Sequence, residues 1–286
     1  MRGFSAKAQS SPLSQRAPSS LAGEGRGGGS GAHAQAATAL PRLTTPTPIP
    51  SPQGVGEQRA SRAEILLLGI AFHADPAGVL YWPEEKLLVA ADLHLEKGSA
   101  FAARGVLLPP YDTAETLARL ALLIAHYAPR RIIALGDNFH DGDGPARMTD
   151  RDRAALVALQ RGRDWLWVAG NHDPDPAENI GGDFVATLAL GPFTFRHEPA
   201  KEPQAGEIAG HLHPLARLAR RGHAVSRRCF VSDGERLVMP AFGAYAGGLN
   251  VRDRAFAALF GARPFTAHML GARRLYAVAA ARCLPD

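Results

Sequence analysis

The chain has 286 residues, of which 46% are hydrophobic and 21% charged, enough for one sizeable core or two small ones. The apolar run over residues 65–72 is too short to cross a bilayer, and the first thirty residues lack the apolar block of a secretory signal. Two cysteines cannot form a disulfide framework. We therefore expect a cytoplasmic protein without membrane contact.

The formal net charge of +5 lies mostly in the first sixty residues, which hold six basic and two acidic groups and leave 26 basic and 25 acidic groups after them. The same segment contains nine Gly and seven Pro, so it cannot bury enough apolar surface to offset its ordering entropy. We predict a disordered tail over residues 1–60 and a folded domain over residues 61–286. A transit peptide, or translation that starts near Val55, would explain the same composition.

From Ser61 onward, short apolar runs alternate with helical patterns. The runs of the first half predict strands over residues 65–72, 87–91, 131–135 and 165–169. Helical spacing of leucines predicts a helix over residues 112–127, and a second helix is predicted over residues 150–160, with Thr149 as its N-cap. This alternation of strands and helices indicates a layered α/β domain.

Beyond Gly182 the apolar runs become shorter and are separated by tight turns. Six strands are predicted there, over residues 184–188, 193–196, 207–209, 224–231, 236–239 and 275–279. One helix is predicted over residues 253–260.

Side chains that can bind metals come directly after these strands. Asp92 and His94 follow the strand over 87–91, and Asp137 follows the strand over 131–135. The other members of this group follow later strands: Asn171, His172, Asp173, His197, His211 and His213. Because α/β sheets place ligands outside the carboxyl ends of their strands, we expect these groups to converge at one edge of the molecule.

Two pairs in this group, Asp92-Leu93-His94 and His211-Leu212-His213, have i, i+2 spacing, which places both side chains of a pair on one side of an extended chain. Carboxylate, amide and imidazole ligands together suit Mn, Fe or Zn better than Ca or Mg. The group is larger than one ion needs. We therefore expect two divalent ions, with Asp137 as their bridge.

Five blocks in this order resemble the complete signature of the calcineurin-like metallophosphoesterases: Asp92-x-His94, Gly136-Asp137, Gly170-Asn171-His172-Asp173, His197 and Gly210-His211-x-His213. Further segments are similar to a narrower branch, the ligase-associated DNA damage response endonucleases of the PdeM type: Tyr81-Trp82-Pro83, the run from Ala91 to Gly98, the stretch from Arg104 to Asp112, the run from Phe195 to Pro199 and the run from Pro240 to Tyr245. The resemblance begins near Arg62.

The resemblance implies an α/β fold, a four-layer αββα sandwich of two mixed β-sheets flanked by helices, with the metal site at one edge. It also implies that Asp92, His94, Asp137 and His213 hold one metal ion. Asp137, Asn171, His197 and His211 would then hold the other. Manganese is the metal that we expect first, with iron or zinc as alternatives.

Several residues near these ligands are candidates for contact with a substrate. His172 lies beside Asn171 but outside the ligand set, so we expect it to protonate a leaving oxygen or to stabilise the equatorial phosphate oxygens. Asp173 would orient and charge that imidazole. Lys97 and Arg104 are candidate phosphate contacts, as are Arg217 and Arg220 in a basic run that turns at Gly222. A solvated hairpin explains this run equally well.

The chemistry implied is metal-dependent hydrolysis of a phosphodiester. The resemblance further implies DNA as substrate, an endonuclease role in the response to DNA damage, and a repair ligase and helicase as partners. Hydrolysis of a nucleotide or another small phosphoester is the alternative, because site chemistry says little about what carries the phosphate. A non-catalytic adaptor is a further alternative, which the intact ligand set argues against.

Overall fold

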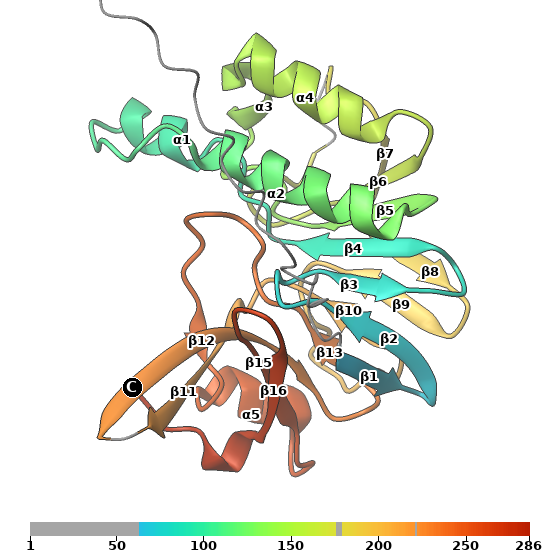
Figure 1. Ribbon diagram of the computed structural model, residues 1–286, viewed down its shortest axis with the longest axis vertical. Helices are drawn as coiled ribbons and strands as arrows, with labels where there is room; N and C mark the ends of the chain where they lie inside the picture. Colours follow the sequence, from blue (N-terminus) through green and yellow to red (C-terminus); the bar gives the residue numbers. More distant parts are fainter. Residues whose placement is uncertain (1–62, 176–178, 221) are drawn as a thin grey trace, which may run out of the picture. The chain divides into compact units, whose positions relative to one another are not determined.

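Two β-sheets pack face to face in the part of the chain that the computed structural model describes, residues 63–175, 179–220 and 222–286 (Figure 1). The tail predicted over residues 1–60 lies outside these residues, and so does the side chain of Arg220. The described residues belong to one compact unit.

The first sheet is mixed and runs in chain order. Its seven strands are β1 (Ala63–Leu67), β2 (Ile70–Ala74), β3 (Leu80–Trp82), β4 (Leu87–Ala91), β5 (Arg131–Leu135), β6 (Asp164–Val168) and β7 (Asp183–Val185). Strands β1 to β4 pair antiparallel, whereas β4 to β7 pair parallel. The carboxyl ends of β4, β5 and β6 therefore meet at the same edge.

The second sheet is also mixed. Its strands are β8 (Leu188–Leu190), β9 (Phe193–Arg196), β10 (Glu207–Ala209), β11 (Pro214–Arg220), β12 (His223–Ser232), β13 (Leu237–Val238), β14 (Leu249–Asn250), β15 (Thr266–Leu270) and β16 (Leu275–Ala279). Strands β9, β10 and β13 are parallel neighbours, while β11 and β12 form the long hairpin that the turn at Gly222 predicts.

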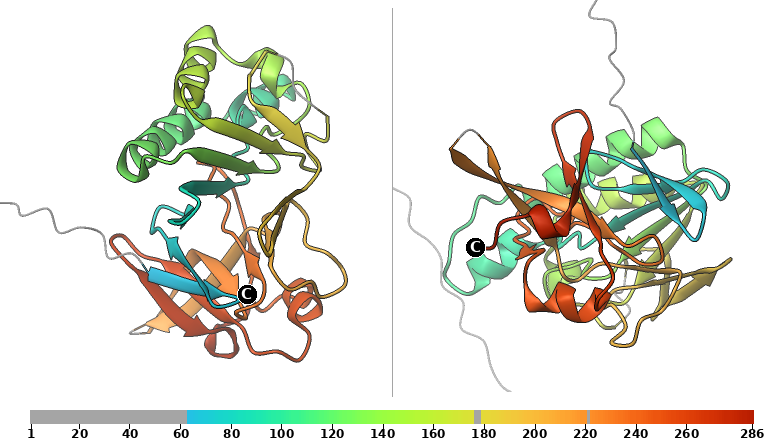
Figure 2. Two further views of the ribbon diagram at one scale, coloured as in Figure 1. Left: turned by 90° about the vertical axis from the view of Figure 1, so that its right-hand side faces the viewer. Right: turned by 90° about the horizontal axis from the view of Figure 1, so that it is seen from below.

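Helices cover the outer face of each sheet, as the views in Figure 2 show. The helices are α1 (Lys97–Ala103), α2 (Asp112–Tyr127), α3 (Gly144–Arg147), α4 (Asp150–Gln160), α5 (Arg254–Phe260) and the 3-10 helix η1 (Ala280–Arg282). Helices α2 and α4 pack on the first sheet and α5 on the second, which confirms the predicted αββα sandwich. No helix of the described residues has the length and apolar character of a membrane span.

Strand β4 shows how the sequence specifies these layers. Leu87 and Val89 lie in the core between the sheets, whereas Leu88 and Ala90 lie in the core beneath α2. All five residues of the strand are buried because both of its faces are covered. A continuous apolar run is the pattern of such a strand, and it places Asp92 where the apolar run ends.

The predicted elements agree with the structure where the periodicity is strong. Helices α2 and α4 and strands β4 and β5 have the predicted bounds, and Thr149 caps α4 by accepting a hydrogen bond from the Asp152 backbone N–H at 3.1 Å. The strand predicted over 65–72 is wrong, because Leu68 and Gly69 both have positive φ, 50° and 80°, and form a two-residue hairpin turn between β1 and β2.

A buried ion pair between Glu207 and Arg236 provides a test of stability. Their exposed fractions are 1% and 3%, and the guanidinium also donates hydrogen bonds to the carbonyls of Leu259 at 2.7 Å and Ala200 at 2.9 Å. Glu207→Ala would leave this charge buried without its partner, so the free energy of unfolding should fall by about 3–5 kcal/mol. Denaturant unfolding would measure it.

Glu235→Ala is the matched control, because Glu235 forms an ion pair with Arg263 whose side chains are 43% and 56% exposed. This substitution should change the free energy of unfolding far less than Glu207→Ala, because solvent screens an exposed pair. If both substitutions lowered the free energy of unfolding by the same amount, burial would not distinguish the Glu207–Arg236 pair from the Glu235–Arg263 pair.

Candidate metal centre

The metal-capable side chains lie at the edge where β4, β5, β6, β9 and β10 end. Asp92 and His94 follow β4, and Asp137 follows β5. The other members come from the segments after β6, β9 and β10: Asn171, His197, His211 and His213. Segments up to about 120 residues apart are thereby brought together, as the contact between His94 and His213 shows.

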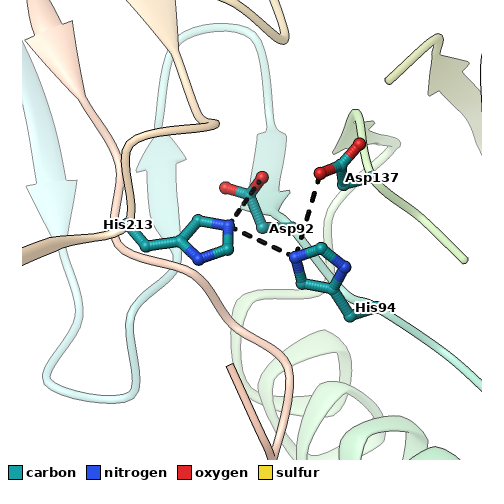
Figure 3. Close-up of side chains that lie close together, drawn as sticks. All are labelled: Asp92, His94, Asp137 and His213. Atoms are coloured by element: carbon teal, nitrogen blue, oxygen red, sulfur yellow. Dashed lines mark hydrogen bonds and ion pairs between the residues drawn. The ribbon is translucent and has the colours of Figure 1, made fainter. Parts of the chain in front are cut away.

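Asp92, His94, Asp137 and His213 form the first cluster (Figure 3). One ligand atom of each lies within 4.8 Å of the others. The Nε2 atom of His213 lies 3.2 Å from Asp92 Oδ1 and 3.3 Å from His94 Nε2. Asp137 Oδ2 lies 3.9 Å from His94 Nε2. Four donors thus surround one position.

Asp137, His197 and His211 form the second cluster, so Asp137 belongs to both. Its Oδ1 lies 3.2 Å from His197 Nε2. Asn171 joins this cluster through its Oδ1, which is 2.8 Å from His197 Nε2 and 2.9 Å from His211 Nδ1. The two clusters contain the two ligand sets that the resemblance implies.

The donor chemistry of both clusters fits divalent metal ions. Imidazole rings face one another and face carboxylates, with His211 Nδ1 at 3.2 Å from His197 Nε2. Burial and the neighbouring His213 lower the pKa of His94 to about 3, which keeps this imidazole neutral and its lone pair available. Imidazole and carboxylate ligands together are typical of transition-metal sites.

Electrostatic contacts keep Asp137 ionised at the junction of the clusters. Burial opposes its charge, but the hydrogen bond and the charge of His197 hold the pKa of Asp137 below its usual value. The backbone N–H of His172 also donates a hydrogen bond to Asp137 Oδ1, at 3.0 Å. An ionised carboxylate shared by two clusters is the group that would bridge two cations.

The backbone is strained at many of these ligands. Positive φ angles occur at five of them: Asp92 (53°), His94 (44°), Asp137 (44°), His211 (67°) and His213 (45°). Each such residue costs about 1–3 kcal/mol, and such strain concentrates at functional sites where surrounding structure maintains it. Backbone hydrogen bonds maintain it here, for example from His94 N–H to Asp137 C=O at 2.9 Å.

Gly136 is required next to the centre because its φ is 72° and a Cβ atom there would lie 2.3 Å from the His197 side chain. Gly136→Ala should therefore displace His197, so that metal content falls to about one ion per chain and thermal stability decreases by at least about 1 kcal/mol. Elemental analysis and thermal unfolding would measure both. Gly142→Ala, where a Cβ has open space, is the control; equal metal content in the two variants would contradict the prediction.

A pocket of about 420 Å³ opens beside the first cluster. It is lined by His94, Lys97, His140, His172, His211, Leu212, His213, Gly247, Gly248 and Leu249. The ring of His172 is fixed by a contact of 2.8 Å between its Nδ1 and the His140 carbonyl, and its Nε2 lies 3.9 Å from Asp137 Oδ2. His172 thus stands at the pocket with one ring nitrogen anchored.

Asp173 is not the residue that anchors this imidazole. Its Oδ2 instead accepts hydrogen bonds from the backbone N–H groups of Asn138, at 2.9 Å, and Phe139, at 3.2 Å. Burial raises the pKa of Asp173 to about 6 despite these bonds. The structure therefore places Asp173 as a support of the loop after Asp137, and the His140 carbonyl has the orienting position expected for Asp173.

The basic candidates lie at different places. Lys97 lines the pocket and its ammonium donates to the Tyr245 carbonyl at 3.0 Å, while Arg104 is exposed at the end of α1. Arg217 donates to the Pro285 carbonyl at 3.2 Å. Arg228, from the same basic run, points inward to three backbone carbonyls. The described part of this run therefore does not form one continuous basic surface.

The segment 241–249 also contacts the site, although its sequence predicted no functional role. Its Gly243 N–H donates to the Asp92 carbonyl at 3.1 Å, and its Leu249 N–H donates to the His213 carbonyl at 3.0 Å. Arg228 holds the middle of the segment through the carbonyls of Ala241, Gly243 and Ala246. The segment braces two ligands of the first cluster. The resemblance around Pro240 to Tyr245 was the signal that could have indicated this.

Comparison with known proteins gives one family match and two similar solved structures. Residues 85–221 match the family model of the calcineurin-like phosphoesterases. The crystal structure of Pseudomonas putida nuclease MPE is 25% identical, with a TM-score of 0.57, and the match covers 76% of this chain and 100% of that chain. Yfce, a phosphoesterase from E. coli, is 15% identical with a TM-score of 0.34, over 68% of this chain and 98% of that chain. No curated protein sequence matches the chain.

The fold and the site thus define a metal-dependent hydrolase that acts on phosphoester bonds. The match of residues 85–221 to the calcineurin-like phosphoesterase model confirms the resemblance noted in the sequence.

Proposed function

We propose that this protein is a cytoplasmic dimetal phosphodiesterase that cuts DNA, as an endonuclease in the response to DNA damage. The similarity to a nuclease, over the whole of that nuclease chain, supports a nucleic-acid substrate. A repair ligase and a helicase are the partners proposed with it. Manganese is the proposed metal, with iron or zinc as alternatives.

The observation that carries the diesterase proposal is the composition of the pocket. Among the described residues that line it, Lys97 is the one lysine or arginine, and its amine nitrogen already donates to the Tyr245 carbonyl. Leu212, Gly248 and Leu249 form an uncharged part of the wall. A phosphodiester carries one negative charge and an organic group on each side, so it fits this wall better than a monoester with two negative charges.

Each residue has a role in this proposal. Asp92, His94, Asp137 and His213 would hold one ion, and Asp137, Asn171, His197 and His211 the other. Two bound cations supply charge neutralisation at the phosphate oxygens and lower the pKa of a water nucleophile. His172, anchored through Nδ1, would present Nε2 to the leaving oxygen and donate a proton to it.

The test is a substrate panel with Mn²⁺: single-stranded, duplex and nicked DNA, RNA, cyclic nucleotides and a small chromogenic phosphodiester. A DNA nuclease that contacts several phosphates should lose affinity steeply with rising salt, because counterions are released on binding. Arg104→Ala, Arg217→Ala and Arg220→Ala would each reduce this salt dependence if those residues contact phosphates. Turnover of nucleotides alone with a flat salt response would favour the small-molecule alternative, and absence of metal and turnover would favour an adaptor.

A further inference from the structure

Three large apolar side chains are exposed together on the loop between α1 and α2, residues 104–111. The exposed fractions are 50% for Val106, 87% for Leu107 and 68% for Tyr111. Elsewhere in the described residues, Leu66 and Leu68 are exposed as a pair at the β1–β2 hairpin, at 58% and 41%, and others such as Leu122 on α2 stand singly. Single exposed apolar residues are ordinary, whereas a group of them marks an interaction site.

The 104–111 loop is held in place although its side chains face solvent. Its first turn is closed by hydrogen bonds to the Phe101 carbonyl from the N–H groups of Arg104, at 2.9 Å, and Val106, at 3.0 Å. At its other end, the buried Asp112 accepts a hydrogen bond from Gly98 N–H at 3.0 Å. Pro109 and Pro110 restrict the backbone between these anchors. A rigid loop that presents apolar groups loses little entropy when it binds a partner.

The loop is connected to the wall of the metal-centre pocket by direct contacts. The Tyr245 hydroxyl donates to the Pro109 carbonyl at 3.0 Å, and the Tyr245 carbonyl accepts from Lys97, which lines the pocket. The ring of Phe101, on the helix that leads into the loop, lies 5.5 Å from the ring of the pocket residue His140. A chain molecule with one phosphodiester in the pocket would therefore reach the loop.

The chemistry of the loop identifies its partner. It offers aliphatic side chains, one aromatic ring and the cation of Arg104, and it contains no acidic residue. Nucleobases that are not paired expose apolar faces that stack on aromatic and aliphatic groups, beside phosphates that attract a cation. A duplex hides those faces within its stack and offers the loop only its charged backbone.

We infer that the 104–111 loop binds the unpaired bases that flank the phosphodiester in the pocket, with Tyr111 and Leu107 as the base contacts and Arg104 as a phosphate contact. The inference rests on the proposed function as a nuclease. In this inference the loop selects the substrate, whereas the metal-binding residues carry out the reaction.

The experiment measures binding of the full chain to a single-stranded oligonucleotide that carries a fluorescent base analogue, together with turnover of that oligonucleotide and of a small chromogenic phosphodiester. Leu107→Ser and Tyr111→Ala should each weaken oligonucleotide binding by about tenfold, in line with the loss of one stacked base. Turnover of the small phosphodiester should stay unchanged. Tyr111→Phe keeps the ring and should retain wild-type affinity.

Leu122→Ser is the matched control, because Leu122 is 73% exposed on α2 and lines no part of the pocket. Wild-type affinity of the Leu107 and Tyr111 variants would overturn the inference. A change of oligomeric state in sedimentation would also overturn it and would identify the loop as an interface with a second copy. If wild type binds the oligonucleotide but turns over no phosphodiester, the proposed function fails while the loop assignment stands.

Discussion

Asp137→Asn should reduce turnover of a phosphodiester by about 10³-fold or more and should lower the metal content of the purified protein. Asp137 is the residue common to both clusters, is 2% exposed and has contacts from both of its oxygens. The substitution removes the negative charge that offsets two cations while it preserves the shape of the side chain. Metal ions contribute several kcal/mol to stabilising the transition state of phosphoryl transfer, so their loss corresponds to at least this factor.

Elemental analysis and steady-state kinetics of the same preparation would check both parts of this prediction. Asp141→Asn is the control, because Asp141 lies in the same loop but forms an ion pair with Arg147, outside the clusters. It should retain two ions and wild-type turnover. Two tightly bound ions and full activity in the Asp137 variant would rule out the bridging role.

The sequence predicts that the metal-capable side chains gather at one edge because they follow strands, whereas the choice of metal ligands among them came from the resemblance. A buried strand such as β4 gives a continuous apolar run, and the residue that follows it, Asp92, must lie at the carboxyl edge of the sheet. Parallel pairing with β5 then brings Asp137 to the same edge. The layer order follows from the same pattern, since β4 contributes alternate residues to two cores.

Other parts of the site depend on contacts that no local pattern contains. The bracing segment 241–249 meets Asp92 and His213 through backbone hydrogen bonds, which any residue type can form. The carbonyl that anchors His172 comes from His140, 32 positions earlier, whereas adjacency in sequence had favoured Asp173. Peptide groups are the same in every residue, so sequence spacing cannot show which of them a side chain contacts.

His172→Ala should leave both metal ions bound and slow the cleavage of DNA by about 10²–10⁴-fold, which is the usual contribution of a positioned acid. Its ring lines the pocket, lies outside both clusters and is 40% exposed, so its removal takes no ligand from the centre. The size of the effect should depend on the leaving group. A nitrophenolate departs without a proton, so hydrolysis of a nitrophenyl phosphodiester should slow much less than cleavage of DNA.

This dependence on the leaving group separates proton donation from a structural role. If His172 only supported the fold, its substitution would slow the cleavage of both substrates equally and would lower thermal stability. His223→Ala, at an exposed position at the start of β12, is the control for replacing a surface imidazole and should change neither rate. Asp173→Ala should act differently from His172→Ala, because it removes the oxygen that accepts hydrogen bonds from the backbone N–H groups of Asn138 and Phe139. Its main effect should be on stability and on the placement of Asp137, measured as reduced metal affinity, with the same loss of rate on both substrates.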